Sequence, residues 1–216
     1  MTPRLVRRLW RHHLPLGMAS IVSAWALYAT RSYPDVITRL SFATAYPALA
    51  LLAATLAIGP WHILAGKAAV TSLDLRRDVG IWAGILGVLH TGVGQCVHLR
   101  GRPWLYYIYE NWQADHWQPL RHDIFGAANF TGLFAALMLI ALLATSNDAA
   151  LRRLGTPGWK QLQRWNYACF GLTALHCFCY QLGIESQAAG FVAAAIASVA
   201  IAAALQLAGW RRRVTR

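Results

Sequence analysis

The chain has 216 residues, of which 57% are hydrophobic and only 13% are charged. Soluble globular domains carry about 25% charged residues, so a water-exposed surface built from this chain would be largely apolar and prone to aggregation. The composition therefore excludes an ordinary soluble domain and predicts a protein of the lipid bilayer. No long polar stretch marks a second domain, so we expect residues 1–216 to form a single transmembrane domain.

Six apolar segments follow one another along the chain, each with the roughly 17–23 residues that a bilayer core requires. They lie at about 14–30, 43–65, 79–98, 126–145, 165–182 and 188–210. The first follows a basic segment, as a signal peptide does, but it lacks a clear small-residue cleavage site, so we expect a retained helix. The predicted fold class is thus an all-α, polytopic bundle of six transmembrane helices.

Basic residues are distributed unevenly between the segments that connect these helices. With the N-terminus inside, only five of the 20 Lys and Arg residues lie in the outer loops: Arg31, Arg39, Arg100, Arg102 and Arg121. The other fifteen lie in the inner segments, which is a strong positive-inside pattern. It predicts a membrane protein with both termini in the cytoplasm. Topology and anionic lipid then explain the net charge of +12, and no nucleic-acid partner is expected.

Two histidines reach the same depth on different predicted helices. His90 and His176 each lie about 11 residues into their spans, roughly 16 Å from the inner boundary. Ionisable residues at this depth are rare and usually functional, and a pair of neutral imidazoles can supply both axial ligands of a haem iron. The residues alone leave two interpretations open. The pair ligates one haem, or each ring hydrogen-bonds a neighbouring carbonyl.

A third histidine, His98, follows His90 by eight residues at the outer end of the third span. On a continuous helix this spacing places it about 12 Å further along the axis and turns its side chain about 80° away. His90 and His98 are therefore not expected to share one iron. Three roles remain open for His98: a hydrogen bond to a haem propionate, ligation of a second, outer cofactor, or contact with water.

Three stretches carry a family resemblance: "LRRDVGIWAGILGVLH" (75–90), "LLATSNDAALRRLGTPGWKQLQRWNY" (142–167) and "TALHCFCY" (173–180). They resemble the ferric reductase-like transmembrane domain, and most of all its bacterial branch, the haem-binding membrane subunits of periplasmic methionine sulfoxide reductase systems. The resemblance covers roughly residues 45–185. It implies six helices enclosing b-type haem that carries electrons across the membrane, with His90 and His176 as the matching ligands.

The sequence also departs from the family at two places. The family often has a second histidine on the fifth span, 13 residues before the first, and here that position is Gln163. An amide is a poor ligand for haem iron, so the resemblance implies one haem b and leaves an inner haem without this ligand. His62 is the inner-side histidine that offers a substitute. The segment "PLRHDIFGAANF" (119–130) lacks the Arg-Pro-Tyr-like approach expected of the methionine sulfoxide branch.

Two surfaces are candidates for binding partners. The outer loop 99–125 is rich in aromatic residues. It fits either an interfacial segment among lipid headgroups or a docking surface for a periplasmic redox protein or a larger membrane complex. On the inner side, Arg76 and Arg77 are candidates for holding a haem propionate, the phosphate of FMN or a quinone head group, although the positive-inside pattern also explains them.

The main functional hypothesis is a one-haem electron-transfer subunit that passes electrons from quinol or a cytosolic flavoprotein to a periplasmic redox partner. The alternative is a structural or accessory subunit of a larger respiratory or photosynthetic complex, with a reduced redox role. A di-haem quinol oxidoreductase of the cytochrome b561 type needs four ligands at two depths, and the sequence supplies two good ones. No G-x-G-x-x-G motif follows a strand, so a self-sufficient NAD(P)H reductase is not expected. The eight acidic residues are expected mostly in loops.

Overall fold

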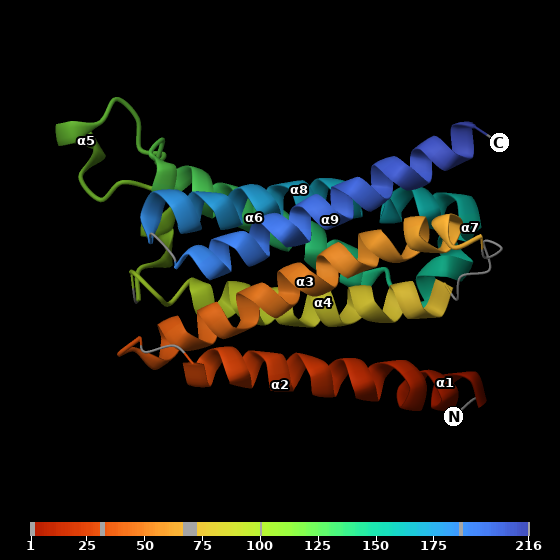
Figure 1. Ribbon diagram of the computed structural model, residues 1–216. Helices are drawn as coiled ribbons and strands as arrows, with labels where there is room; N and C mark the ends of the chain where they lie inside the picture. The colour runs from red at the N-terminus through yellow and green to blue at the C-terminus, as the bar shows by residue number, and fades with distance from the viewer. Residues whose placement is uncertain (1–2, 31–32, 67–72, 100, 186–187, 216) are drawn as a thin grey trace.

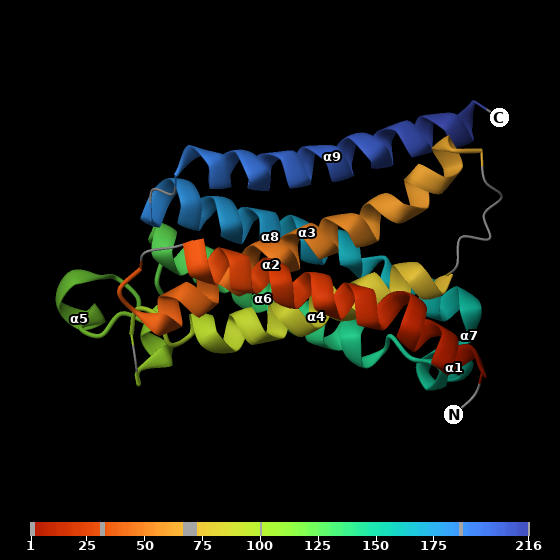
Figure 2. The same ribbon diagram turned by 60° about the horizontal axis from the view of Figure 1, so that its bottom comes forward.

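A computed structural model describes residues 3–30, 33–66, 73–99, 101–185 and 188–215. These residues form an all-helical bundle in which the single β contact is an isolated bridge between Ile108 and Leu120. The predicted all-α class is confirmed. The main helices are α2 (Leu14–Thr30), α3 (Val36–Leu64), α4 (Leu73–Gly94), α6 (Ile124–Ala144), α8 (Trp165–Phe178) with its π-helical continuation η3 (Cys179–Ile184), and α9 (Ala189–Val214). They run side by side, with both termini at the same end (Figures 1 and 2).

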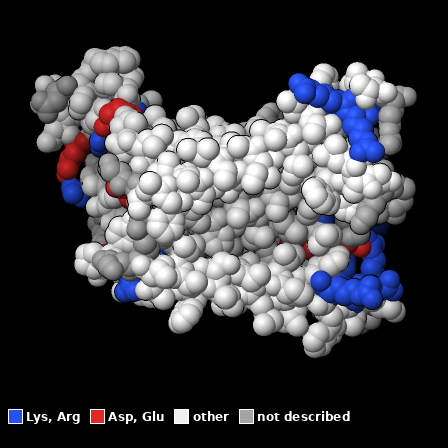
Figure 3. All heavy atoms as spheres, in the orientation of Figure 1, with Lys and Arg blue, Asp and Glu red and all other residues white. Residues whose placement is uncertain are grey.

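Short elements cover the two ends of this bundle, which differ in charge. One end carries the termini, α1 (Pro3–Arg8), the π-helix η1 (Leu9–His13) and α7 (Asp148–Gln163). Most of the Lys and Arg side chains visible in Figure 3 gather there, so we call it the basic end. The opposite end, here the loop end, carries the 3-10 helix η2 (Pro103–Tyr106) and α5 (Trp112–Asp115). Four basic residues used in the charge argument lie outside the described residues: Arg31, Lys67, Arg100 and Arg216.

Four stretches of the described chain are long and apolar enough to cross a membrane: Val36–Leu64, Ile124–Ala144, Asp148–Ile184 and Ala189–Val214. They identify a multi-pass membrane protein. The predicted spans 14–30 and 79–98 also form bundle helices, but α2 has only 17 residues and α4 begins with two charged turns. The predicted count of six spans therefore stays a prediction.

Two boundaries differ from the sequence prediction. The third span was expected to reach residue 98, but α4 ends at Gly94 because the Tyr106 hydroxyl binds the chain there. This hydroxyl donates to the Gly94 carbonyl (3.1 Å) and accepts the N–H of His98 (2.8 Å). The segment between the fourth and fifth predicted spans, to which no helix was assigned, is largely the helix α7. A kink at Gly155, whose φ of 67° suits glycine, divides α7 in two.

The membrane helices α3 and α6 each begin at an aspartate. Asp35 accepts the Thr38 N–H at 2.9 Å, and Asp123 accepts the Gly126 N–H at 2.7 Å. Each carboxylate satisfies a backbone donor of the first turn that no carbonyl of the helix can reach. These two caps fix where α3 and α6 start, both at the loop end.

A proline inside α3 explains why α9 packs where it does. Pro60 has no N–H, so the carbonyl of Leu56 lacks its partner within the helix. Gln206 of α9 supplies the missing donor, with its Nε2 at 2.6 Å from that carbonyl oxygen. Gly209 lets the two helices approach, because a Cβ atom there would come within 2.9 Å of Pro60. A buried polar defect in one helix is thus satisfied by its neighbour.

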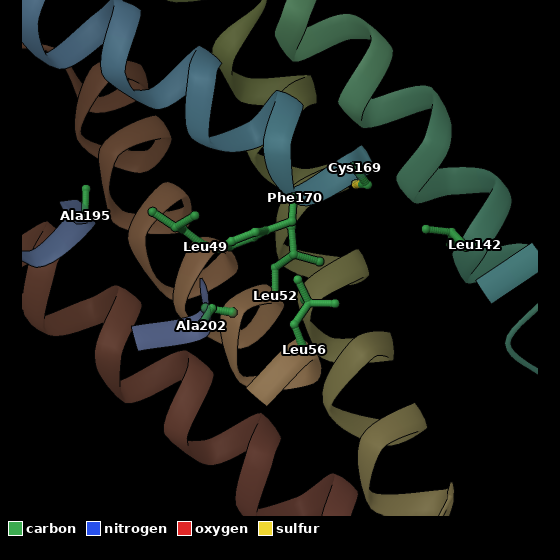
Figure 4. Close-up of a cluster of buried hydrophobic side chains, with 10 residues drawn as sticks. Leu49, Leu52, Leu56, Leu142, Cys169, Phe170, Ala195 and Ala202 are labelled. Atoms are coloured by element: carbon green, nitrogen blue, oxygen red, sulfur yellow. The ribbon is translucent and has the colours of Figure 1, made fainter. Parts of the chain in front are cut away.

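The hydrophobic core lies where α3, α8 and α9 meet. Figure 4 shows Leu49, Leu52 and Leu56 of α3 gathered around Phe170 of α8. Small residues such as Ala202 let α9 close over this cluster. The core occupies the middle of the bundle, next to the cavity described below, since Leu49 and Leu52 contribute to both.

Candidate functional site

A cavity of about 180 Å³ lies between α3, α4, α6 and α8, in the half of the bundle nearer the loop end. It extends from Leu52 and Ala83 in the middle of the bundle to His98 and Glu185 at the loop end. Much of its wall consists of residues without long side chains: Ala45, Ala48, Ala83, Gly87, Gly132, Ala135 and Ala136. Such a wall leaves room for a flat, mostly apolar group between the helices.

His90 of α4 and His176 of α8 meet across this cavity. Their ring centroids are 6.1 Å apart, and the ring planes are inclined by 72°. Both residues line the cavity wall. The structure thus brings together the two histidines that the sequence placed at one depth, although they are 86 positions apart.

Each of the two rings is oriented by a backbone carbonyl. Nδ1 of His90 lies 3.0 Å from the Ser41 oxygen, and Nδ1 of His176 lies 2.8 Å from the Ala128 oxygen. A carbonyl oxygen can only accept, so each Nδ1 donates its proton and each Nε2 keeps a lone pair. Metal-ligating histidines commonly have such an orienting partner. Each ring thus bonds a backbone carbonyl, which was one of the two interpretations of the sequence. These bonds use Nδ1 only, so Nε2 of both rings stays available for the other interpretation, ligation of a haem iron.

The separation of the rings fits two axial ligands of one metal ion. Two metal–nitrogen bonds of about 2 Å, extended by the ring radius on each side, give a centroid separation of roughly 6 Å. The measured 6.1 Å agrees with this value. Gly132 makes the position of His176 possible, because a Cβ atom at this residue would lie 2.6 Å from Nδ1 of that ring. The residues present therefore fit a haem held between α4 and α8.

The cavity becomes polar toward the loop end. Tyr180 of η3 lies beside His176, with ring centroids 5.0 Å apart, and its hydroxyl donates to Asn129 at 3.0 Å. The next residue, Gln181, donates to the Tyr46 hydroxyl at 2.7 Å. These side chains hold one another in place around the loop-end half of the cavity. Sequence reasoning missed them, because single Tyr, Asn and Gln residues in an apolar helix carry no motif.

His98 lies in the turn after α4 rather than on its last turn. Its ring stacks on Tyr180, with centroids 6.1 Å apart and planes inclined by 13°, and its Nε2 lies 3.6 Å from the Glu185 carboxylate. The argument from a continuous helix is therefore wrong for His98, because α4 ends at Gly94. His98 nevertheless remains apart from the His90–His176 pair and lines the loop-end part of the same cavity.

The other three predicted site residues lie at the basic end. Arg76 donates to the Thr55 carbonyl at 3.0 Å, and Arg77 forms an ion pair with Asp148 at 2.6 Å. Gln163 is the last residue of α7. Arg77 precedes His90 by 13 residues, about 20 Å along α4. The predicted site residues thus fall into two groups, one around the cavity and one at the basic end.

The acidic residues were expected mostly in loops, but two of them, Asp74 and Asp78, lie on α4. Asp78 is fully buried, and Arg8, His12 and His13 all contact its carboxylate. The sequence held a signal for this cluster, since an acid directly before a long apolar segment needs partners once it is buried. The basic N-terminal segment, which the charge count treated only as a topology signal, supplies them.

The fold and the cavity together define a multi-pass helical membrane protein with a paired-histidine site in its apolar interior. No family model matches the chain. The chain is similar to the protein-methionine-sulfoxide reductase heme-binding subunit MsrQ of Deinococcus radiodurans, with 29% identity over 161 residues, and of Xanthomonas axonopodis pv. citri, with 30% identity over 143 residues. The matches cover 74% and 66% of this chain, and 68% and 58% of the two relatives. The resemblance to the haem-binding subunits of methionine sulfoxide reductase systems, seen in the sequence, is thereby confirmed.

Proposed function

We propose that this chain is a haem-binding electron-transfer subunit of a bacterial inner membrane, formed by residues 1–216 as one domain. The observation that carries the proposal is the His90–His176 pair, whose 6.1 Å separation and carbonyl-oriented rings suit two axial ligands. The names of the two similar proteins, which are heme-binding subunits, support the same cofactor.

In this proposal the cofactor is haem b, and its iron supplies one-electron redox chemistry when it is bound. Nε2 of His90 and Nε2 of His176 would hold the iron. Ser41 and Ala128 hold the two rings in the ligating tautomer through their carbonyls. The surrounding apolar wall excludes water from the site and thereby shields the iron from side reactions.

We propose one haem rather than two. Gln163, which stands where the family often has a second ligand on this span, is an amide, and its Nε2 is a buried donor without a partner among the described residues. An amide nitrogen donates hydrogen bonds and has no lone pair to offer a metal. A donor in this place suits an oxygen-bearing group, such as a quinone or the phosphate or ring carbonyl of FMN, better than it suits iron.

The direction of transfer follows from the distribution of charge. We propose that α2 and α4 also cross the bilayer, which gives six spans with the basic end in the cytoplasm. Electrons then enter from quinol or a cytosolic flavoprotein at the basic end, near Arg76 and Arg77. They leave to a periplasmic redox partner at the loop end, where Trp104 and Trp117 are exposed on the segment 99–125.

The test is the difference spectrum of the reduced minus the oxidised purified protein, with a haem-to-protein ratio. The proposal predicts a low-spin b-type signal at about one haem per chain, and loss of that signal in His90→Ala and in His176→Ala. His122→Ala is the matched control, because this histidine is exposed at the loop end and does not line the cavity. Freshly isolated protein without haem, or a signal that survives both substitutions, would contradict the proposal.

A second candidate function is a structural or accessory subunit of a larger membrane complex. It is favoured by Gln163, since loss of a ligand position is expected where a redox role is reduced. Purification from native membranes discriminates between the two. Fixed stoichiometry with other membrane subunits and substoichiometric haem favour the accessory role, whereas one haem per chain favours electron transfer.

A further inference from the structure

Asp78, at the basic end, is in contact with three basic side chains. Nε and Nη2 of Arg8 both donate to it, Nδ1 of His12 lies 2.7 Å from one of its oxygens, and Nε2 of His13 lies at an ion-pair distance of 3.2 Å from the other. A carboxylate has about four lone-pair sites, and Arg8 and His12 occupy three of them with hydrogen bonds. One arginine is enough to neutralise the charge of Asp78, and the two histidines are therefore additional.

The local helix type brings the two histidines together. In an α-helix, five residues rotate by about 500°, so His13 would point about 140° away from Arg8. Residues 9–13 instead form the π-helix η1, which has more residues per turn. In this helix His12 and His13, the fourth and fifth residues after Arg8, both lie on the same face as Arg8. This wider turn directs His12 and His13 at the same carboxylate. Single π-turns of this kind are frequent at functional sites.

The contacts with Asp78 favour one proton position on each ring. A carboxylate only accepts, so Nδ1 of His12 carries its proton toward it. The proximity of the same carboxylate to Nε2 of His13 favours the proton on that nitrogen. When each ring is neutral, the opposite nitrogens, Nε2 of His12 and Nδ1 of His13, keep lone pairs and can accept protons. A histidine oriented by a buried carboxylate is a standard general base, and here one carboxylate orients two of them.

Two further polar atoms lie between this cluster and the haem cavity. Trp82 follows Asp78 by one turn of α4, and Ser20 of α2 is only 4% exposed. Neither Trp82 Nε1 nor Ser20 Oγ has a hydrogen-bond partner among the described residues. The two helices are close there, since a Cβ atom at Gly17 would lie 2.7 Å from the Trp82 ring. The cavity wall begins at Ala83, about 7.5 Å along α4 from Asp78.

The cluster is accessible from the apolar surroundings of the bundle. The side chains of His12 and His13 are 20% and 21% exposed. Large apolar residues on the same segment, Trp10 and Leu14, are 69% and 48% exposed. Exposed apolar residues beside a partly open polar group suit a donor that arrives through the lipid rather than from water.

We propose that His12 and His13, oriented by Asp78, accept the two protons of a lipid-soluble hydroquinone that donates electrons to this protein. The inference rests on the proposed haem function and deepens it by assigning the residues that take the protons of the donor. Both O–H bonds of the hydroquinone break, and Nε2 of His12 and Nδ1 of His13 each take one proton. The two electrons leave the hydroquinone one at a time for the haem that His90 and His176 would hold, the first passing on to the periplasmic redox partner before the second arrives, and the oxidised quinone leaves. Arg8 remains paired with Asp78, and the Arg4–Asp74 and Arg77–Asp148 pairs lie at the same end of the bundle.

The test compares two reductants on the purified full chain with its haem bound. Decylubiquinol delivers electrons together with protons, whereas dithionite delivers electrons alone. In the double variant His12→Gln and His13→Gln, the rate of haem reduction by decylubiquinol is expected to fall at least about a hundredfold, the lower end of the range for loss of a general base. The rate with dithionite and the haem-to-protein ratio are expected to stay unchanged. Arg11→Gln, an exposed substitution in the same π-helix, is the matched control and is expected to behave as the unmodified chain.

The outcomes separate the inference from the function on which it rests. Absence of haem from the unmodified chain overturns both. Haem that is reduced by decylubiquinol at the same rate in the double variant overturns the inference alone, and so does haem that decylubiquinol does not reduce in the unmodified chain. If the double variant loses haem, His12→Gln and His13→Gln are measured singly. The inference then requires that at least one of them slows reduction by decylubiquinol and leaves the dithionite rate unchanged.

Discussion

The cavity site and the Asp78 cluster both hold polar groups inside an apolar bundle, and they stabilise these groups in opposite ways. In the cavity, His90 and His176 each bond one backbone carbonyl, so no charge is buried. At the basic end, a carboxylate is buried, and an arginine of α1 and two histidines of η1 lie against it. The first solution depends on the close approach of backbones, and the second depends on opposite charges.

This difference determines what each site can do. Rings held by carbonyls stay neutral and keep one nitrogen free, which suits ligation of a metal in an apolar place. Rings held by a carboxylate are good proton acceptors, because the carboxylate stabilises the imidazolium that forms. A histidine is therefore suited to act as a metal ligand or as a base according to whether a carbonyl or a carboxylate orients its ring. The first two predictions below each disturb the partner of one site and leave the other site intact, and the last two concern contacts away from both sites.

The largest expected effect is on cofactor binding through the backbone of α6. A side chain at Gly132 would collide with the ring of His176, because even a Cβ atom there lies 2.6 Å from Nδ1. Gly132→Val is therefore expected to displace His176 and to weaken haem binding by about 10- to 100-fold, the range for loss of a ligand's supporting partner. The measurement is the haem-to-protein ratio over a haem titration.

Gly171→Val is the matched control for this prediction. Gly171 is on α8, the helix of His176, and nothing lies within 4 Å of a Cβ atom built there. This variant is expected to bind haem as the unmodified chain does. Equal haem affinity in both variants would show that the close approach of α6 does not hold His176 in place.

The next effect is on stability at the basic end. Asp78→Asn leaves Arg8 inside the bundle without its counter-charge, and breaking a buried ion pair in this way costs about 3–5 kcal/mol of unfolding free energy. Asp74→Asn, four residues earlier on α4, removes a carboxylate that is 23% exposed and is paired with the mostly exposed Arg4, so a loss below about 1 kcal/mol is expected. Unfolding of both variants in mixed micelles measures the difference. Equal losses would contradict the contrast drawn between the buried and the exposed pair.

A smaller effect is expected in the contact between α3 and α9, away from both sites. Gln206→Leu leaves the Leu56 carbonyl without a donor, which costs about 1–3 kcal/mol. Pro60→Ala restores an N–H to α3 and so offers this carbonyl a partner within its own helix. The loss caused by Gln206→Leu is therefore expected to shrink when Pro60→Ala is also present. A double-mutant cycle measures this coupling, and additive losses would contradict it.

The sequence predicted the helical class, the approximate helix positions and the meeting of His90 with His176, because all three follow from hydrophobic length and from depth along a helix. It could not predict contacts made by the chain outside its membrane segments. Tyr106 ends α4 from a loop twelve residues later, and η1 directs two histidines at Asp78 by a helix type that no residue pattern marks. Tertiary packing, rather than local preference, decides both.

The smallest expected effect concerns pH and the cap of α6. Burial opposes ionisation of Asp123, but the hydrogen bonds from Arg121 and from the Gly126 N–H outweigh it and hold the pKa of this carboxyl below its ordinary value of 3.8. A carboxyl whose pKa is lower in the folded state contributes stability above its unfolded pKa, and this contribution is lost as the pH falls through the folded value. Stability from this group is thus expected to be constant between pH 7 and about 5 and to decline below about 4.

The variant Asp123→Asn isolates this contribution from the other acids. Asparagine also caps helices, but it does not titrate and cannot form an ion pair with Arg121. At pH 7 the variant is expected to lose about 1 kcal/mol or less, because the Asp123 side chain is 37% exposed and solvent screens the pair. Below the folded pKa of Asp123 the unmodified chain is protonated too, so the difference between the two melting temperatures is expected to vanish. A difference that persists at that pH would mean that the aspartate stabilises α6 by shape rather than by charge.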